Sequence, residues 1–366
     1  MADQDDLRAD STHIGRCPLA RLAEVQAFIN THWRAGHILA RDAELLRWQH
    51  RATATDLALL IATQGDAIVG LLGMIPVGFN LRGVRLSGNW LALWATAAGS
   101  PPALGIQLLA AAMRAGDFTG VLGANQAAMK VYRGLRWATM EAVPRLVRVS
   151  SAAALKRLLG DDVRVPQTLA ISPPIDAAPA TVRPGTIDDL PRWDIAWRDH
   201  FAPQLVSTWK DGEYLRWRYF EHPRFDYQVL FAADGTGRLA GLAVYRQVQV
   251  ADRGSVVMRV VEFLARPDVA VDLARALSHA ADAAGAAFSD FYVTGATANG
   301  SLATAGFVPE GALEVPLPGL LQPVDFSRVS LTAAFHVQSK IVPQSAALID
   351  EALYFTRSDG DQDRPN

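Results

Sequence analysis

Two stretches of the 366-residue chain carry the same succession of helical and strand-like hydrophobic patterns. In the first, a helical period covers residues 19–29, and residues 42–50 form a second predicted helix with Asp42 as its N-cap. Short apolar runs separated by Gly-, Asn- or Asp-containing turns then predict strands. The strands predicted in this half are 57–62, 68–76, 87–96, 121–124 and 145–150, and two more helices are predicted at 104–114 and 126–133.

The second stretch follows a Pro- and Ala-rich segment at 166–184, which is typical of a linker. Thr186 is the predicted N-cap of its first helix, and residues 211–220 form the next. The remaining elements are strands at 227–232, 239–245, 258–265 and 291–294, helices at 269–284 and 299–305, and a last strand entered at Gly306-Phe307. The shared order indicates an internal duplication, although residue identity between the halves is low. It predicts an α/β (α+β) fold of two tandem domains, each a mixed central β-sheet flanked by helices.

The chain is longer than one ordinary hydrophobic core can accommodate, so we expect it to form more than one domain. The pattern places a first domain at 1–160, a linker at 161–182 and a second domain at 183–320. A C-terminal extension with an acidic tail covers 321–366.

Composition narrows the classes of function. Half of the residues are hydrophobic and 20% are charged, which is typical of a globular protein, and a net charge of -2 argues against nucleic-acid binding. The apolar run at 57–74 is interrupted by Gln64-Gly65-Asp66, which predicts a hairpin and not a membrane span. The polar N-terminal residues do not have the pattern expected of a signal peptide. The single Cys17 cannot form an internal disulfide. We therefore expect a cytoplasmic monomer or homodimer that acts on small molecules.

A Gly/Pro turn that opens directly onto a helix, Ser100 to Met113, is the strongest local signal for a ligand. The unpaired N–H groups and the positive partial charge of a helix N-terminus suit a pyrophosphate. The candidate backbone donors are Gly99, Ala103, Leu104, Gly105 and Ile106. The alternative is a simple helix start with Pro in its first turn.

Four stretches together resemble one superfamily. They are PPALGIQLL at 101–109, Asn125 followed by Tyr132-Arg-Gly-Leu-Arg-Trp137, DGEYLRWRYFEHP at 211–223 and NGSLATAGFVPE at 299–310. Over 20–150 and 180–315 the chain resembles the GNAT superfamily of acyl-CoA N-acyltransferases, and within it the two-domain enzymes of nucleotide-sugar and surface-polysaccharide biosynthesis. The resemblance implies that coenzyme A, as acyl-CoA, is the co-substrate.

The chain departs from the family pattern in both halves. Only Gly105 remains of the usual glycine pair, and no Gln or Arg precedes the loop. At the corresponding place the second half has ARPDVAVDLARAL, without glycine, where a Cβ would obstruct a pyrophosphate. One CoA site, in the first half, is therefore predicted.

The resemblance also implies roles for single residues. Asn125 would hold the pantetheine or phosphate region of CoA, or serve only as an N-cap. Tyr132 would protonate the departing thiolate, or pack on the sheet. Glu262 would be the general base, or pair with Arg259 or Arg246. In the equivalent strand of the first half, the polar residues are Ser87 and Asn89, which could orient the amine, or lie at a surface edge.

The candidate acceptor-binding residues combine cations and aromatic rings. Arg216, Trp217 and Arg218 suit a sugar-nucleotide diphosphate, although their alternation alone favours an amphipathic helix with buried rings and solvated arginines. Trp94, His222 and His336 complete the set, and a lone His is often structural.

The acidic tail allows two interpretations. Asp359, Asp361 and Asp363 are loosely spaced like calcium ligands, but no motif predicts a metal site and disorder is the default for such a segment. The strand-like residues before them favour a different hypothesis, in which the tail folds back towards the cleft and helps position an amino-sugar.

Together these observations predict an acyl-CoA-dependent N-acyltransferase. We expect the amine to belong to a nucleotide-linked amino-sugar. It would attack the thioester directly in an interdomain cleft, because no enzyme nucleophile is evident. Two alternatives stay open: an aminoacyl-tRNA-dependent transferase of the same doubled fold, and a non-catalytic binding protein with degenerate GNAT-like domains.

Overall fold

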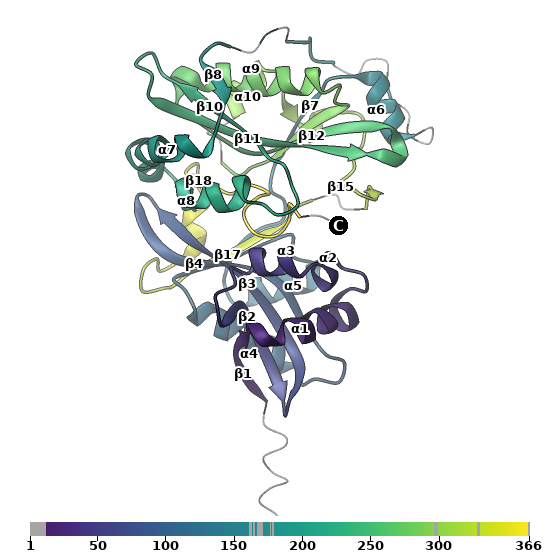
Figure 1. The fold of residues 1–366 in the computed structure, drawn as a ribbon, viewed down its shortest axis with the longest axis vertical. Helices are drawn as coiled ribbons and strands as arrows, with labels where there is room; N and C mark the ends of the chain where they lie inside the picture. The colour runs from purple at the N-terminus through teal and green to yellow at the C-terminus, as the bar shows by residue number, and fades with distance from the viewer. Residues whose placement is uncertain are drawn as a thin grey trace, which may run out of the picture.

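The computed structural model describes residues 12–160, 163, 165–166, 171–175, 177, 179–295, 299–327 and 330–364. Two sheets with their helices lie one above the other along the long axis, and the C-terminal segment lies between them (Figure 1). The predicted mixed α/β fold is confirmed. The acidic start of the chain, part of the predicted linker and residues 365–366 lie outside the described residues.

The first sheet has the strand order β1-β2-β3-β4-β5-β17-β6, and β9 and β18 extend it beside β3. Its strands are β1 (His13–Pro18), β2 (Asp56–Gln64), β3 (Ala67–Leu81), β4 (Val84–Thr96), β5 (Phe118–Leu122), β6 (Ala138–Met140), β9 (Val206–Thr208), β17 (Ala333–Val337) and β18 (Leu353–Tyr354). Its helices are α1 (Leu22–Phe28), continued by the π-turn η2 (Ile29–Trp33), α2 (Ile38–Arg41), α3 (Ala43–Gln49), α4 (Ala103–Arg114) and α5 (Gln126–Gly134). The buried aliphatic side chains of β2, β3 and β4 form cores on both faces of this sheet.

The second sheet has the order β14-β7-β13-β12-β11-β10-β8. Its strands are β7 (Arg145–Val149), β8 (Val182–Pro184), β10 (Gln228–Ala233), β11 (Leu239–Val250), β12 (Ser255–Ala265), β13 (Phe288–Tyr292) and β14 (Val308–Pro309). Its helices are α6 (Ala152–Leu159), α7 (Leu190–Ala196), α8 (Gly212–Leu215), continued by the π-turn η6 (Arg216–Phe220), α9 (Pro267–Ala283) and α10 (Asn299–Thr304). A small hairpin of β15 (Leu320–Leu321) and β16 (Val324–Asp325) follows.

The two halves exchange a strand. Residues 145–150 form the predicted strand, β7, but it does not close the first sheet: it pairs with β13 and β14 of the second. In return β17, from the C-terminal part, lies between β5 and β6 of the first sheet. All five residues of β7 are buried, and an apolar pattern does not say which sheet covers a strand. The proposed domain limits stay a prediction, since both sheets draw strands across them.

A pair of matching helices supports the internal duplication. Asp42-Ala-Glu-Leu-Leu-Arg-Trp48 corresponds to Asp211-Gly-Glu-Tyr-Leu-Arg-Trp217, and each Asp caps its helix. The two tryptophan rings stack at 5.1 Å. Each indole N–H donates to the other tryptophan's carbonyl, at 3.1 and 3.3 Å. The contact is reciprocal, as expected where two copies of one unit meet around an approximate two-fold axis.

Candidate active site

A cleft opens between β4 and β5 of the first sheet. The two strands pair in parallel only where Gly88–Trp90 lies beside Phe118–Gly120. Beyond this point Leu91–Trp94 on one side and Val121–Tyr132 on the other contribute most of the lining of a cleft of about 420 Å³. The facing backbone edges of the separated strands are not paired with each other. They can therefore bind an extended chain that carries amide groups, as an added strand would.

The wall made by β4 is irregular at the cleft. A register shift against β3 falls beside Ala92 and Ala95, and Leu93 has a φ of 55°. A bulge leaves backbone groups outside the ladder, and a positive φ at a leucine is a strained conformation that is typical of functional sites. The bulge therefore lies in the wall of the cleft, which Ala92 and Leu93 both line.

The opposite wall is kept open by small residues. Gly123, Ala124, Ala127 and Ala128 all line the cleft. Gly123 has a φ of 69°, and a Cβ there would overlap the Gln362 side chain from the C-terminal tail. Glycine is thus required at this position both for the turn and for docking of the tail.

The predicted pyrophosphate loop reaches the cleft through Trp94. The five predicted donors lie in or just before the first turn of α4: Gly99, Ala103, Leu104, Gly105 and Ile106. The Trp94 indole lines the cleft and donates to the Gly105 carbonyl at 3.1 Å. A Cβ on Gly105 would lie 3.3 Å from the indole nitrogen. The structure therefore gives Gly105 a packing role beneath Trp94, and the phosphate role of these residues stays a prediction.

Asn125 and Tyr132 both line the cleft. The Asn125 side chain accepts from the Ala128 N–H at 2.9 Å, which confirms it as the N-cap of α5. The Tyr132 ring is buried and stacks on Trp137 at 4.6 Å. Burial raises the pKa of the Tyr132 phenol, so the hydroxyl keeps its proton at neutral pH. Such a group can donate to a thiolate.

Ser87 and Asn89 lie at the closed end of β4. The Ser87 hydroxyl donates to the Asp117 carboxylate at 2.8 Å, and Asn89 lies beside Thr119 where the strands are still paired. Neither side chain is among the residues that line the cleft. The geometry favours the structural alternative for both.

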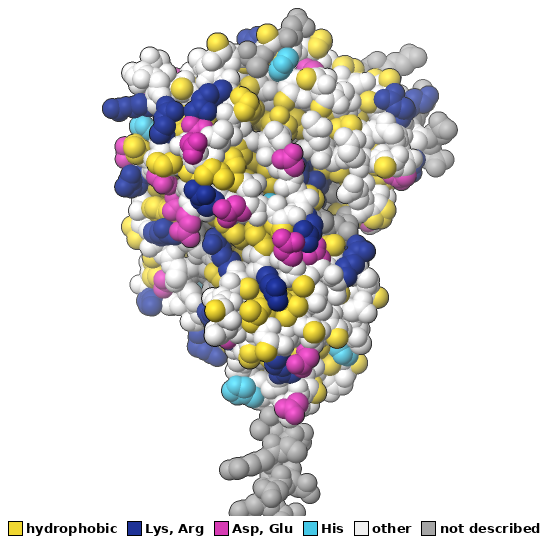
Figure 2. Space-filling model, in the orientation of Figure 1, with side chains coloured by type: hydrophobic (Ala, Val, Ile, Leu, Met, Phe, Trp, Pro, Cys, Tyr) yellow, Lys and Arg dark blue, Asp and Glu magenta, His cyan; other side chains and the backbone are white. Residues whose placement is uncertain are grey.

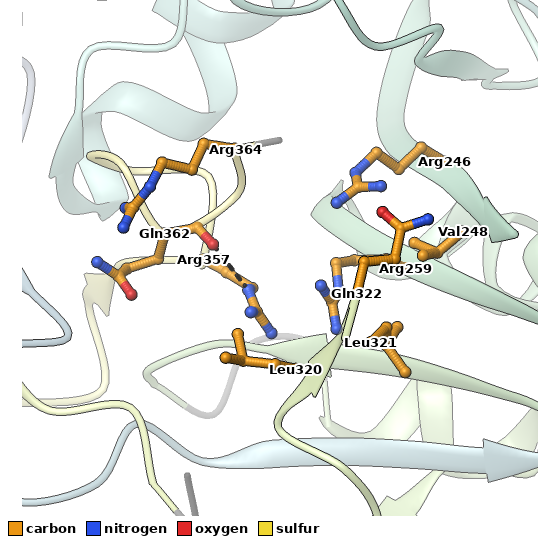
Figure 3. Close-up of a pocket in the computed structure, with 9 residues that line it drawn as sticks. All are labelled: Arg246, Val248, Arg259, Leu320, Leu321, Gln322, Arg357, Gln362 and Arg364. Atoms are coloured by element: carbon orange, nitrogen blue, oxygen red, sulfur yellow. Dashed lines mark hydrogen bonds between the residues drawn. The ribbon is translucent and has the colours of Figure 1, made fainter. Parts of the chain in front are cut away.

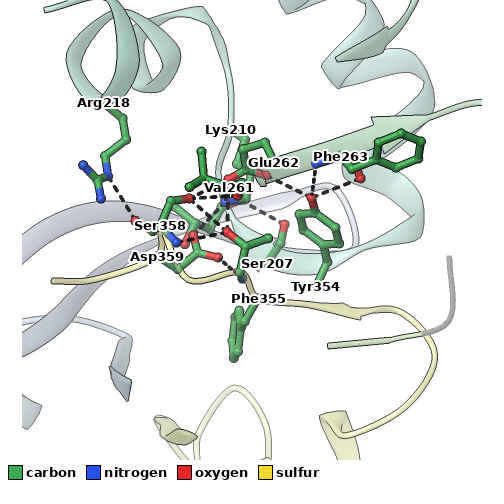
Figure 4. Close-up of polar contacts among 12 residues, drawn as sticks. Ser207, Lys210, Arg218, Val261, Glu262, Phe263, Tyr354, Phe355, Ser358 and Asp359 are labelled. Carbon is green, nitrogen blue, oxygen red and sulfur yellow. Dashed lines mark hydrogen bonds and ion pairs between the residues drawn. The ribbon is translucent and has the colours of Figure 1, made fainter. Parts of the chain in front are cut away.

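Glu262 lies at the centre of a buried polar network (Figure 4). Its carboxylate accepts from the Lys210 ammonium at 2.6 Å and from the hydroxyls of Tyr219 at 2.8 Å, Tyr354 at 3.0 Å and Ser358 at 3.0 Å. Burial opposes the charge on Lys210, but Asp359 and Glu262 outweigh it and raise the pKa of this ammonium. Glu262 is fully buried and does not line the β4–β5 cleft.

Glu262 forms its buried ion pair with a different residue from the two arginines that the sequence suggested. Arg259 binds Asp290 and Arg246 binds Asp363, so neither neutralises Glu262. The expectation of an ion pair with either arginine is therefore wrong. Lys210, which lies far away in the sequence, takes that place.

The tail occupies the equivalent cleft of the second sheet. β12 and β13 also pair in parallel over only three positions, Met258–Val260 with Ser289–Phe291. Beyond these, the tail hydroxyl of Ser358 donates to the Val261 carbonyl, and the Tyr354 hydroxyl accepts from the Phe263 N–H. On the other side Thr356 forms a bridge with Val293. The second cleft is therefore filled by the protein's own chain, which agrees with a single CoA site.

From Tyr354 to Arg364 the tail is folded between the two sheets, so disorder is the wrong interpretation for these residues (Figure 1). Its three carboxylates bind three different cations: Asp359 binds Lys210, Asp361 binds Arg364 and Asp363 binds Arg246. Among the described residues no group of three His, Cys, Asp or Glu side chains is placed to hold a metal ion. All three carboxylates are thus engaged in salt bridges.

The predicted acceptor residues do not converge. Arg216 extends towards solvent near Glu221, Trp217 packs on Trp48, and Arg218 is buried, donating to the Ser358 carbonyl at 3.0 Å. His222 accepts two backbone N–H groups at Nδ1, and burial lowers its pKa to about 3, so it is neutral. His336 lies on β17, half-buried beside Trp137.

A second, more polar cavity of about 430 Å³ lies next to the cleft. The two share Gly123, Ala124 and Asn125 at the end of β5 and Gln362 of the tail. Tyr292, Thr332 and Arg357 are among its other lining residues. A molecule in this cavity would face one in the cleft across the end of β5.

The hypothesis that the tail folds back towards the cleft agrees with the structure, but the sequence did not single out the tail residues that line the cleft as site residues: Asp361, Gln362 and Arg364. Sequence reasoning also missed Trp33 at the end of η2. The available signal was the apolar Leu353-Tyr-Phe355 run before the acidic residues, which indicates a buried segment.

The face of the molecule in Figure 2 shows no single-sign patch of charge among the described residues. On the face seen in Figure 2, Lys and Arg side chains are interspersed with Asp and Glu over both halves. No described helix is long and apolar enough to cross a membrane.

Comparison with known proteins rests on structure alone, because no protein-family model and no curated protein matches the sequence. A GCN5-related N-acetyltransferase from Anabaena variabilis superposes with a TM-score of 0.54 at 9% identity, covering 89% of this chain and 73% of its own. Saccharomyces cerevisiae N-myristoyltransferase with bound myristoyl-CoA gives 0.53 at 10% identity, covering 89% and 80%. A GCN5-related N-acetyltransferase from Kribbella flavida gives 0.50 at 16% identity, covering 77% and 64%. The chain therefore has the fold of the GCN5-related N-acetyltransferases.

Proposed function

We propose that the protein is an N-acyltransferase that binds acyl-CoA in the β4–β5 cleft and transfers the acyl group to an amine. The observation that carries the proposal is the separation of β4 and β5 after three paired residues, which opens an apolar cleft between backbone edges. The pantetheine arm of CoA is an extended chain with two amides, so it can bond to those edges while its apolar parts contact Leu91, Val121 and Val131. The N-terminus of α4, beside Trp94, would receive the pyrophosphate.

The chemistry of transfer requires a proton acceptor and a proton donor. The amine nitrogen attacks the thioester carbon, an N–C bond forms and the C–S bond breaks. Asp361 is the one carboxylate among the described residues that line the cleft. We assign it as the general base that accepts the proton from the amine. Tyr132 gives its proton to the thiolate and regains one from solvent. A backbone N–H at the Leu93 bulge would stabilise the oxyanion.

The amine would enter from the polar cavity on the other side of β5. A nucleotide-linked amino-sugar is the acceptor that the sequence resemblance suggests, and the hydroxyl, amide and guanidinium groups of Thr332, Asn125 and Arg357 suit a polar molecule. Glu262, whose carboxylate is enclosed by Lys210 and three hydroxyls, is assigned here to holding the tail and not to proton transfer.

Ala127→Trp tests the cleft. Ala127 is an exposed residue of α5 that lines the cleft, so an indole would fill the space for pantetheine without disturbing the core. Lys130→Trp is the matched control, because Lys130 is exposed on the same helix and outside the lining. CoA at 100 times its Kd should stabilise the wild type by about 2.7 kcal/mol in thermal denaturation. We expect Lys130→Trp to keep this gain and Ala127→Trp to lose most of it.

Two results would contradict the proposal in different ways. Absence of any stabilisation of the wild type by millimolar CoA would favour the non-catalytic alternative. Equal stabilisation of Ala127→Trp and the wild type would place the CoA site elsewhere. A screen of acyl-CoAs against amines, with release of the free thiol as readout, then tests transfer itself.

A further inference from the structure

A cluster of four arginines, three of them buried and Arg364 half-buried, lies where the tail meets the second sheet. Arg246, Arg259, Arg357 and Arg364 line a small cavity with Gln362 (Figure 3). Arg246 lies directly opposite Arg259 on the antiparallel strands β11 and β12, and both are buried. Two like charges facing each other on neighbouring strands are destabilising, so this arrangement needs anions nearby.

The carboxylates of the described chain satisfy only part of the cluster. Asp363 binds Arg246 at 2.7 Å, and Asp361 binds Arg364 at 2.6 Å. Asp290 binds Arg259 at 3.2 Å but also binds Arg145, at 2.8 Å. Each of these carboxylates is therefore already engaged.

Arg357 has no carboxylate partner within the described residues. Its guanidinium donates to two backbone carbonyls, those of Gln362 at 3.2 Å and Gly319 at 3.4 Å, and lies over the Tyr292 ring. Burial, together with the positive charge of Arg259, lowers the pKa of Arg357 to about 10. The cation is thus held in a place where a further negative charge would be favourable.

The position of Arg357 connects this cluster with the proposed site. Arg357 lines both the arginine cavity and the polar cavity beside the cleft, and Arg364 lines both the arginine cavity and the cleft. Gln362 lines all three. An anion bound by Arg357 could therefore belong to the molecule whose amine reaches the thioester.

The size of the arginine cavity selects among anions. Its volume is about 30 Å³, against about 430 Å³ for the polar cavity beside the cleft, so it admits only a small group. A planar carboxylate can meet a guanidinium with two parallel hydrogen bonds in such a space, whereas a tetrahedral phosphate needs more room.

We propose that the arginine cluster, with Arg357 as its principal donor, binds a carboxylate of the amine acceptor. The acceptor is then an amine that also carries a carboxylate, such as the amino-sugar of the proposed function in an acidic form. This inference rests on the proposed acyl transfer for the identity of the ligand as acceptor. The binding of the anion itself does not depend on transfer.

The first experiment measures anion binding by the full chain without any reaction. Thermal denaturation is followed with acetate, with inorganic phosphate and with chloride at constant ionic strength. We expect acetate to stabilise the wild type, and Arg357→Gln to lose this effect. The matched control Arg198→Gln, at an exposed arginine, should keep it. Stabilisation by phosphate but not by acetate would overturn the proposal that the ligand group is a carboxylate. Equal stabilisation of the wild type and Arg357→Gln by acetate would overturn the proposal that Arg357 binds the anion.

The second experiment compares pairs of acceptor amines that differ only in the carboxylate: in one the group is a free acid, in the other it is the corresponding amide. The wild type should prefer the acid by about 10- to 100-fold in kcat/KM, the range expected for a hydrogen-bonded ion pair. Arg357→Gln should lose the preference mainly through KM while still acylating the amide, and Arg357→Lys, which keeps the charge without the fork, should retain part of it. An undiminished preference in Arg357→Gln would overturn the proposal. Acetate binding without transfer to any amine would instead contradict the proposed function and leave the anion site supported.

Discussion

Replacing Lys210 by methionine should destabilise the protein more than any single change to its two acidic partners. The ammonium is fully buried and lies 2.6 Å from Glu262 and 2.7 Å from Asp359, which are also fully buried. The three groups together carry one positive and two negative charges, a net charge of −1. Lys210→Met changes this to −2, whereas Asp359→Asn changes it to zero and leaves an ion pair with Glu262.

The magnitude follows from this charge balance. Removing one partner of a buried ion pair costs about 3–5 kcal/mol, because the other charge is left uncompensated. Methionine retains most of the apolar stem of lysine, so little of the loss comes from packing. At about 2 °C for each kcal/mol in a chain of this size, the midpoint should fall by roughly 6–10 °C. Asp359→Asn should lower it by less than half as much.

The assay is thermal and urea denaturation of Lys210→Met, Asp359→Asn and the double variant, with limited proteolysis of the tail. The double variant should be more stable than Lys210→Met, since Glu262 then keeps three hydroxyl donors and one carboxylate fewer lies nearby. Lys340→Met is the control: Lys340 is exposed and lies 3.8 Å from Asp117, and such surface pairs are worth less than about 1 kcal/mol. A loss within 1 kcal/mol for Lys210→Met, or a larger loss for Asp359→Asn, would refute this view of the network.

Two further predictions concern the cleft and the dependence of stability on pH. Gly105→Glu should weaken CoA binding at least tenfold with the fold intact, because the new side chain displaces the Trp94 indole 3.3 Å away; unchanged affinity in a titration would show that α4 does not contribute to the CoA site. Burial lowers the pKa of His50 to about 4, below the value near 6.5 of the unfolded chain. The neutral buried imidazole therefore makes its full contribution to stability above pH 6.5. This contribution is lost as the pH falls towards 4, at up to about 1.4 kcal/mol per pH unit. His50→Gln should make the melting temperature less dependent on pH between 4 and 6.5, and an unchanged slope would contradict the assignment.

The local elements of this fold can be predicted from the sequence because their signals are local. Asp42, Asn125 and Asp211 each cap the helix that the hydrophobic period predicts, and Gln64-Gly65-Asp66 marks a real hairpin between β2 and β3. The order of the elements was sufficient to predict the fold. These features depend on a few consecutive residues.

The partners of buried groups could not be predicted in the same way. Glu262 was recognised as a buried acid that needs a partner, but Lys210 lies 52 positions away and Asp359 belongs to the tail. Likewise β7 and β17 read as ordinary apolar strands, and only the packing of both halves decides which sheet each one joins. The return of the tail towards the cleft could be proposed from its strand-like residues, but which of its side chains line the cleft, Asp361 and Gln362 among them, depends on the packing of both halves.

The tail gives a physical reason for the two halves to remain together with one open cleft. In the second half it bonds to both separated strands, through Ser358 to β12 and through Thr356 at Val293 beyond β13, so that half cannot hold a second pantetheine chain. The same segment continues to Asp361 and Gln362, which line the first cleft. The buried contacts of the second cleft thus fix the position of residues in the first. If this is correct, Lys210→Met should also lower CoA-dependent acyl transfer at temperatures where the protein is still folded, because a loosened tail withdraws Asp361 from the cleft.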